Sequence, residues 1–156
     1  QYYQITAIDE YSRKRVLKIV KEKSTYETGE FLKSLEAKMG FRINIIQVDN
    51  GAEFVNDDER TDKMGRFQRI AEHLGMQIRR IRPYSPWQNG KVERSHREDG
   101  KILYGRKVFT SEKALKQQVQ KHQKRYNSTA KTSLDFKSPN QIVSEYFSKC
   151  NICIDS

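Results

Sequence analysis

Polar and apolar positions at the amino-terminal end of the chain follow a pattern that predicts a hairpin. Residues 2–8 (YYQITAI) and 14–20 (KRVLKIV) are rich in aromatic and β-branched side chains, which are typical of strands. The segment DEYSR at 9–13 supplies turn residues between them. We therefore expect two paired strands joined by a short loop.

A helix and a further strand are predicted next. Ser24 and Glu27 form a capping-box pattern, and Gly40 is the residue type that commonly ends a helix. The apolar residues between them lie at helical spacing: Phe31, Leu32, Leu35 and Met39. We interpret the run INIIQV at 43–48 as a central strand buried on both faces, entered after a helix as in a βαβ unit.

The rest of the chain is predicted to be mainly helical. The expected elements are an amphipathic helix from Met64 to Leu74, a strand at 76–81, a mobile loop at 82–90, and helices at 91–104, from Ser111 to about Tyr126, and, as a short one, from Pro139 with Ser138 as its cap. Strands therefore alternate with helices before a helical end. This order predicts a mixed α/β domain.

Charge points to a polyanionic partner. The chain has 156 residues, enough for one globular unit, and 30 Lys and Arg against 20 Asp and Glu give a net charge of +10. Nucleic acid is favoured over a membrane, because no stretch approaches the roughly 18 apolar residues of a membrane span and no signal-peptide pattern opens the chain. A surplus of solvated lysines is the alternative. Cys150 and Cys153 form a lone C-x-x-C, which we interpret as reduced thiols of an intracellular protein.

Two acids stand out by their position. Asp49 follows the predicted central strand directly, and Glu93 falls in the first turn of the helix after the proline-containing loop. Ligand sites of α/β sheets lie just beyond the carboxyl ends of strands, and paired carboxylates suit Mg²⁺. The denser acidic cluster at 57–59 lies in a polar loop, and we interpret it as solvated.

Several motifs in order resemble one family. VDNGAEF at 48–54 followed by RPYSPWQNGKVERSHR at 82–97 resembles the catalytic core of the Asp-Asp-Glu transposases and retroviral integrases, specifically the bacterial insertion-sequence branch. The hairpin YYQITAIDEYSRKR and the carboxyl-terminal motifs RYN and FKSPNQIV are similar to that branch as well. The resemblance implies a catalytic core over 1–156, with the core proper at about 1–126 and a helical extension at about 127–156.

The same resemblance implies a ribonuclease-H-like fold, with a mixed sheet flanked by helices. That fold opens with three antiparallel strands and carries its first catalytic aspartate on the first of them, whereas only two strands are predicted here. We expect the missing strand and its aspartate to lie upstream, so that the fragment alone is poorly active. Asp9 is the alternative third ligand, although DEYSR matches the family's turn after its second strand.

The activity implied is metal-dependent DNA 3′-end cleavage and strand transfer, with Asp49 and Glu93 as catalytic metal ligands and two Mg²⁺ or Mn²⁺ ions in the complete site. The implied partners are double-stranded DNA of the element ends and the target, and further copies of the chain in a homo-oligomeric active complex. The implied location is the bacterial cytoplasm, at the nucleoid. Two alternatives stay open: a ribonuclease-H-like nuclease that only hydrolyses, and a DNA-binding module without catalysis.

Residues around Glu93 are candidates for DNA contact. Basic side chains suited to phosphate are Arg82, Lys91, Arg94 and Arg97, and Trp87, with Tyr84 and Gln88, lies in the loop where an aromatic ring can stack on an unpaired base. An ion pair with Glu93 is the alternative for Arg97, and a core anchor is the alternative for Trp87. We interpret His96 as a packing residue, with a place near the metal as the alternative. Gly100 indicates either close backbone approach or a fraying helix.

Overall fold

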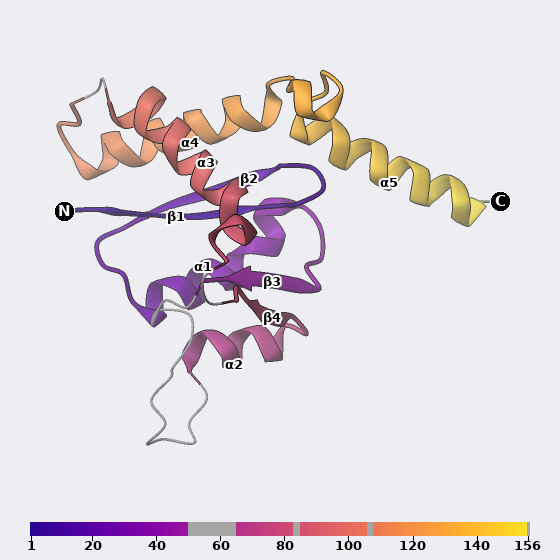
Figure 1. Cartoon of the computed structure of the whole chain (residues 1–156), viewed down its shortest axis with the longest axis horizontal. Helices are drawn as coiled ribbons and strands as arrows, with labels where there is room; N and C mark the ends of the chain where they lie inside the picture. Colours follow the sequence, from indigo (N-terminus) through magenta and orange to yellow (C-terminus); the bar gives the residue numbers. More distant parts are fainter. Residues whose placement is uncertain (50–64, 83–84, 106–107, 156) are drawn as a thin grey trace. The chain divides into compact units, whose positions relative to one another are not determined.

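The computed structural model describes residues 1–49, 65–82, 85–105 and 108–155 (Figure 1). It divides into two compact units, one formed by Gln1–Ile5 with Lys18–Glu98 and the other by Thr6–Leu17 with Asp99–Ser156. The division falls within both strands of the amino-terminal hairpin and just before the last residue of α3 (Gly90–Asp99). The predicted acidic cluster at 57–59 and Tyr84 lie outside the described residues.

The predicted hairpin is present. β1 (Tyr3–Ile8) pairs with β2 (Arg15–Val20), and the bond from Asp9 N–H to the Lys14 carbonyl oxygen, 2.9 Å long, closes the loop. Arg13 adopts a positive φ of 62° within this turn. Both strands agree with the sequence pattern to within one residue at each end.

Helix α1 (Thr25–Met39) has the predicted caps. The Ser24 side chain accepts a hydrogen bond of 3.2 Å from the Glu27 N–H, and Gly40 ends the helix in the left-handed region with φ 85°. The four predicted apolar positions of α1 are all buried. Helix α2 (Arg66–His73) packs against α1 and buries Phe67 and Ala71.

A parallel pair of strands carries the predicted βαβ unit. β3 (Ile45–Val48) pairs with β4 (Gln77–Arg80), with Ile46 opposite Ile78 and Val48 opposite Arg80. The prediction that this strand is central and buried on both faces is wrong: Ile45 is 46% exposed, and Val48 is the strand's one buried residue. The physical reason is that, within the described part of the chain, β3 has a partner strand along one edge only. The described strands thus form two small sheets with helices beside them, and the predicted mixed α/β class is confirmed.

Helices form the remainder of the chain, as predicted. Part of the loop expected at 82–90 is a 3₁₀ turn, η1 (Pro86–Asn89), which leads into α3; beyond α3 come η2 (Gly100–Tyr104), α4 (Glu112–Ser128), η3 (Thr132–Leu134) and α5 (Pro139–Asp155). Ser111 caps α4 by accepting from the Ala114 N–H at 3.1 Å. Helix α5 runs to 17 residues rather than one short segment. It begins with reciprocal bonds in which Ser138 N–H donates to Gln141 Oε1 and Gln141 N–H donates to Ser138 Oγ.

The helix predicted at 91–104 changes its geometry partway. The α-helical pattern ends at Asp99 and continues as one turn of π-helix, η2, in which Leu103 is buried. A Cβ atom at Gly100 would meet nothing within 4 Å, so close backbone approach does not explain this glycine. At Gly105, in contrast, a Cβ atom would lie 2.8 Å from the Gly100 carbonyl oxygen. None of the described helices is long and apolar enough to cross a membrane.

Candidate metal and nucleic-acid site

Asp49 and Arg82 lie at the same edge of the β3–β4 sheet. Because β3 and β4 are parallel, with Val48 opposite Arg80, the residues that follow both strands leave the sheet at one side. The Ile81 N–H donates to the Val48 carbonyl oxygen at 3.0 Å and extends this pairing by one residue. Asp49 and Arg82 come directly after that last bond, and both are exposed. A carboxylate and a guanidinium therefore stand at the carboxyl edge, where α/β sheets bind ligands.

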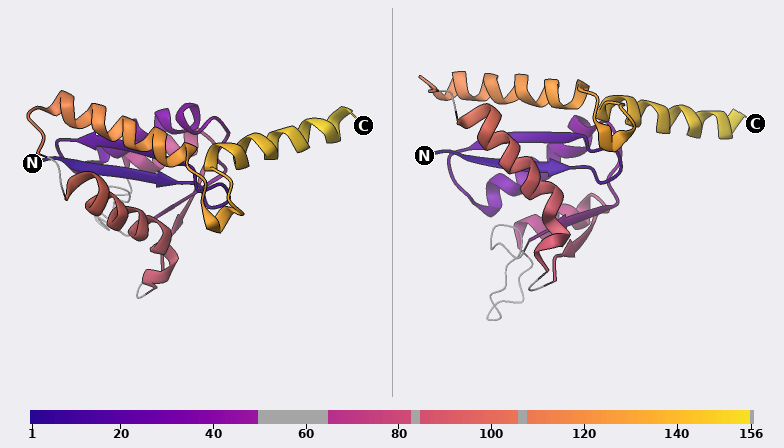
Figure 2. Two further views of the ribbon diagram at one scale, coloured as in Figure 1. Left: turned by 90° about the horizontal axis from the view of Figure 1, so that it is seen from above. Right: turned by 45° about the horizontal axis from the view of Figure 1, so that its top comes forward.

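Glu93 is placed by the start of α3. The Gly90 N–H donates to the Trp87 carbonyl oxygen, and this bond joins η1 to the helix. Glu93 is the acid in the first turn of α3 and is exposed. In all three views of the chain, the carboxyl ends of β3 and β4 lie beside the amino-terminal end of α3 (Figures 1 and 2). The elements that carry the two predicted acids therefore converge within one unit.

Exposed basic side chains surround Glu93 along α3. Lys91, Arg94 and Arg97 are all exposed, and Arg97 follows Glu93 by one helical turn. Among the described residues, no ion pair joins Glu93 to Arg97, so the alternative of an intrahelical pair is not realised. Arg97 stays a candidate for phosphate contact.

Two interpretations of neighbouring residues are settled by exposure. Trp87 is 74% exposed, so the alternative of a core anchor is wrong, and its ring is available to stack on a base. His96 is exposed as well, so the interpretation as a packing residue is wrong. Ser95, one position earlier, is buried instead. Because α3 is strongly polar, its few apolar positions do not define which face of the helix is buried.

The donor chemistry at this edge suits a hard divalent cation. Asp49 and Glu93 offer carboxylate oxygens, which Mg²⁺ and Mn²⁺ prefer. No group of three His, Cys, Asp or Glu side chains with metal-binding geometry occurs among residues 1–49, 65–82, 85–105 and 108–155. The two acids fit part of the predicted site.

Asp9, the alternative third ligand, has a local role in the hairpin turn. Its Oδ2 atom accepts hydrogen bonds from the Ser12 N–H at 2.8 Å and from the Ser12 hydroxyl at 2.6 Å. Such a carboxylate holds the turn by bonding the backbone a few residues on. The geometry therefore favours a structural role for Asp9.

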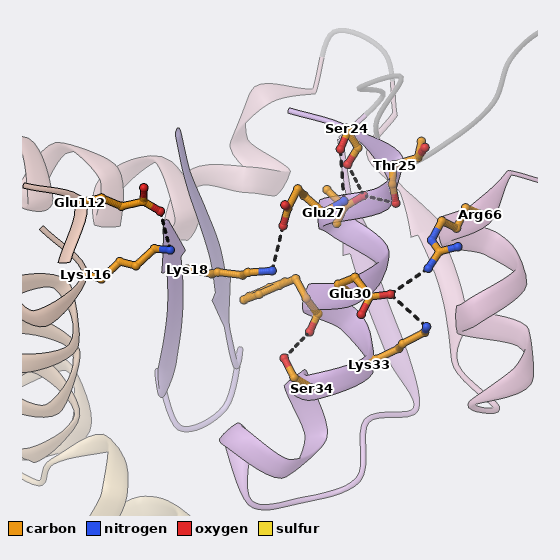
Figure 3. A network of polar contacts seen from close by, with 12 residues as sticks. Lys18, Ser24, Thr25, Glu27, Glu30, Lys33, Ser34, Arg66, Glu112 and Lys116 are labelled. Atoms are coloured by element: carbon orange, nitrogen blue, oxygen red, sulfur yellow. Dashed lines mark hydrogen bonds and ion pairs between the residues drawn. The ribbon is translucent and has the colours of Figure 1, made fainter. Parts of the chain in front are cut away.

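A second charged region lies between α1 and α2. Glu30 accepts hydrogen bonds from Lys33 at 3.0 Å and from Arg66 at 2.8 Å, as Figure 3 shows, and both bonds lower the pKa of the Glu30 carboxyl. The Arg66 guanidinium also lies 4.9 Å from the centroid of the Tyr26 ring. The residues lining a groove of about 320 Å³ here are Lys33, Arg66, Arg69, Ile70, His73 and Leu74. None of them belongs to the predicted site.

Sequence patterns missed a buried polar cluster in the other unit. Arg15 and Asp99 form a fully buried ion pair, which His122 and Asn127 complete. The sequence singles out His122 only as one position on a helical stripe with Leu115 and Val119. Arg15 and Asp99 are 84 positions apart, so no local pattern connects them.

Comparison with known proteins identifies the family. Two sequence profiles, both described as "Integrase core domain", match residues 1–86 and 74–139. No curated protein shows significant sequence similarity.

Solved structures of similar fold include two from viral integration systems. One is a chain of the cryo-EM structure of the simian T-cell lymphotropic virus intasome in complex with PP2A regulatory subunit B56 gamma, with a TM-score of 0.71 and 20% identity over 90% of this chain and 48% of that chain. The other is the catalytic core domain of BIV integrase, with a TM-score of 0.67 and 17% identity over 94% of this chain and 88% of that chain. The chain thus spans about half the length of the first.

At these identities the likeness concerns the fold, and it confirms the ribonuclease-H-like arrangement of integrase catalytic cores. The first profile alone covers more than half of the sequence. The chain belongs to the integrase core domain family.

Proposed function

We propose that the chain is the catalytic core of a transposase of the insertion-sequence type, which cuts DNA at the 3′ ends of an element and joins those ends to a target. The observation that carries the proposal is the placement of Asp49 and Glu93. Asp49 follows β3 at the carboxyl edge of the β3–β4 sheet, and Glu93 lies in the first turn of α3, the helix beside that edge. Membership of the integrase core domain family supports it.

In this proposal Asp49 and Glu93 would hold Mg²⁺ or Mn²⁺, as two of the carboxylates of a site for two ions. When bound, the ions would activate the attacking oxygen and stabilise the oxygen that leaves. The first reaction is attack of water on a phosphodiester, which releases a 3′-hydroxyl. In the second, that hydroxyl attacks a target phosphodiester, one P–O bond forms as another breaks, and the departing oxygen takes up the proton.

The remaining predicted residues bind and orient DNA. Four exposed basic residues contact phosphates on either side of the cut: Arg82, which leaves the same sheet edge as Asp49, and Lys91, Arg94 and Arg97, which lie within four positions of Glu93. Trp87 stacks on an unpaired base near the cut end, and Gln88 lies next to it in η1. Several copies of the chain assemble on the DNA in the cytoplasm, at the nucleoid.

The test is a joining assay on the full-length product of the gene. Duplexes taken from the DNA ends that flank the gene are incubated with a target plasmid and Mg²⁺ or Mn²⁺. We expect joined product from the unsubstituted protein, none from Glu93→Gln, and a normal yield from Glu98→Gln, which removes a different exposed acid of α3.

Three results separate the proposal from its alternatives. Joining that depends on Glu93 supports the transposase. Nicking without joining supports a nuclease that only hydrolyses. DNA binding with no reaction, unchanged by Asp49→Asn, contradicts the catalytic assignment and supports a binding module.

A further inference from the structure

The β3–β4 sheet has one largely buried face and one exposed face. Side chains alternate between the two faces along a strand. On one face Val48 is buried, Ile46 and Ile78 are half-buried, and Arg80 is exposed at the last position of β4. The side chains of the other face are all exposed: Ile45, Gln47, Gln77 and Arg79. This second face is therefore open to a partner.

The exposed face carries a guanidinium beside an amide. The register of the two parallel strands sets Gln47 opposite Arg79 and Ile45 opposite Gln77. An arginine side chain offers a planar fork of N–H donors, which matches two oxygens of one phosphate group. A glutamine amide adds neutral N–H donors. The pair formed by Gln47 and Arg79 thus has the chemistry that binds a phosphodiester.

This pair lies on the same face of the sheet as Asp49. The bond from the Ile81 N–H to the Val48 carbonyl oxygen keeps the strands paired up to their carboxyl ends. Alternation continued by one residue beyond Val48 puts Asp49 on the face of Gln47 and Arg79. The exposure of Asp49 next to a buried Val48 agrees with this placement. Two residues along a strand span about 6.6 Å, so Asp49 follows closely after the pair.

The charge of Arg79 is available to an external anion. Within the described part of the chain, no carboxylate forms an ion pair with its guanidinium. Arg66, an arginine of the same unit, is paired in contrast with Glu30 at 2.8 Å. A solvated cation is the ordinary role of an exposed arginine, and the position of Arg79 beside Asp49 is what distinguishes it.

We propose that the exposed face of the β3–β4 sheet binds DNA, with Arg79 and Gln47 holding a phosphate of the strand that is cut. This inference rests on the proposed function. DNA is favoured over an acidic protein because the face is continuous with Asp49 and the chain carries a net charge of +10. Contacts of this kind position DNA without reading its sequence. Arg79 thereby fixes where the strand lies relative to Asp49.

The test measures how DNA binding depends on salt, in the full-length protein with Glu93→Gln so that DNA is not cut. The two duplexes are a DNA end that flanks the gene and an unrelated sequence of equal length. Each phosphate contact contributes about 0.9 to the slope of log affinity against log salt concentration. We expect Arg79→Gln to reduce the slope by this amount and to weaken binding of both duplexes about 10-fold. The matched control is Arg69→Gln, which removes the same charge from an exposed residue of α2 and should change neither quantity.

Two further variants keep the fold and separate charge from geometry. Gln47→Glu sets a carboxylate opposite Arg79, where it pairs with the guanidinium and repels phosphate. We expect the same fall in slope as with Arg79→Gln. Arg79→Lys keeps the charge but loses the planar fork, so it should keep the slope and lose part of the affinity. Because both positions are exposed, thermal unfolding of each variant should stay close to that of the parent protein.

Two results overturn the inference. Unchanged slopes in Arg79→Gln and Gln47→Glu would mean that this face does not contact phosphate, as expected if it binds a protein instead. Equal falls in Arg79→Gln and Arg69→Gln would mean a general effect of net charge. The proposed function fails on a different observation, which is normal joining of DNA by Glu93→Gln, so the two failures are distinguished.

Discussion

Asn127 offers a direct test of how β2 and α4 are held together. The side chain is 5% exposed, and its two bonds to Arg15 satisfy both polar groups of that residue's buried backbone. Gln123 extends the arrangement, because its Oε1 atom accepts from the Leu17 N–H at 2.7 Å. Amide side chains of α4 thus take the place that a neighbouring strand has in a sheet. Such cover also keeps the strand edge from pairing with other chains.

The substitution Asn127→Ala removes both bonds and leaves two buried backbone groups without partners. Each buried group left unsatisfied costs about 1 to 3 kcal/mol, so for the two groups we expect a loss of roughly 2 to 6 kcal/mol in the free energy of unfolding. The matched control is Asn140→Ala on α5, since Asn140 is exposed and makes one long bond of 3.4 Å to Ser128. That change should cost less than about 0.5 kcal/mol.

The assay is urea unfolding followed by far-ultraviolet circular dichroism, with the slope of the transition checked for equality between variants. A decrease below about 1 kcal/mol for Asn127→Ala, at an unchanged slope, would refute the reasoning, because it would mean that water replaces the amide without penalty. A similar decrease in both variants would show that the effect is not specific to the buried pair.

Three further predictions concern other parts of the chain. A Cβ atom at Gly29 would lie 2.7 Å from Ile70 Cδ1, so Gly29→Ala should stabilise the protein by about 0.5 to 1 kcal/mol only when Ile70→Val is also present. Thermal unfolding with and without Gly29→Ala, measured both in the unsubstituted protein and in Ile70→Val, tests this. Equal effects in the two backgrounds would contradict the packing. Burial, and second the charge of Asp99, raises the pKa of Tyr104 from 10.0 to about 12. The folded form therefore keeps the phenol proton that the unfolded form loses, so the free energy of unfolding should fall as pH rises from 10.0 to about 12. The difference between the tyrosinate absorbance titrations of the unsubstituted protein and Tyr104→Phe should rise near 12, and a transition near 10.0 would contradict this prediction. The bonds from Lys33 and Arg66 lower the pKa of Glu30 from 4.5, so the stabilisation by its carboxylate is present above pH 4.5 and is lost as pH falls through the lowered pKa. The melting temperature of Glu30→Gln should therefore change less between neutral and acid pH than that of the unsubstituted protein. An equal change in both proteins would contradict this role of Glu30.

Local signals in the sequence predicted the elements well. The caps Ser24, Gly40 and Ser111 mark real helix ends, because capping depends on residues within one turn of each other. The elements that carry Asp49 and Glu93 were predicted in the same way, from a strand end and from a helix start after a proline-containing loop. The roles of both acids stay predictions.

Long-range features were not accessible to such patterns. The burial of β3 depends on which strands lie beside it, and the pairing of Arg15 with Asp99 depends on the approach of segments 84 positions apart. The exposure of Trp87 and His96 depends on the direction in which η1 and α3 face. Tertiary packing decides all of these.

The central claim is that Asp49 binds the catalytic metal, and a change of metal preference tests it most directly. Mg²⁺ is a hard cation that prefers oxygen and binds thiolate poorly, whereas Mn²⁺ accepts softer ligands more readily. The measurement is the rate of DNA joining by Asp49→Cys in the full-length protein with each metal in turn. We predict joining with Mn²⁺ and a loss of at least about 100-fold with Mg²⁺, while the unsubstituted protein works with both. Joining by Asp49→Cys with Mg²⁺ at the rate of the unsubstituted protein would contradict the account.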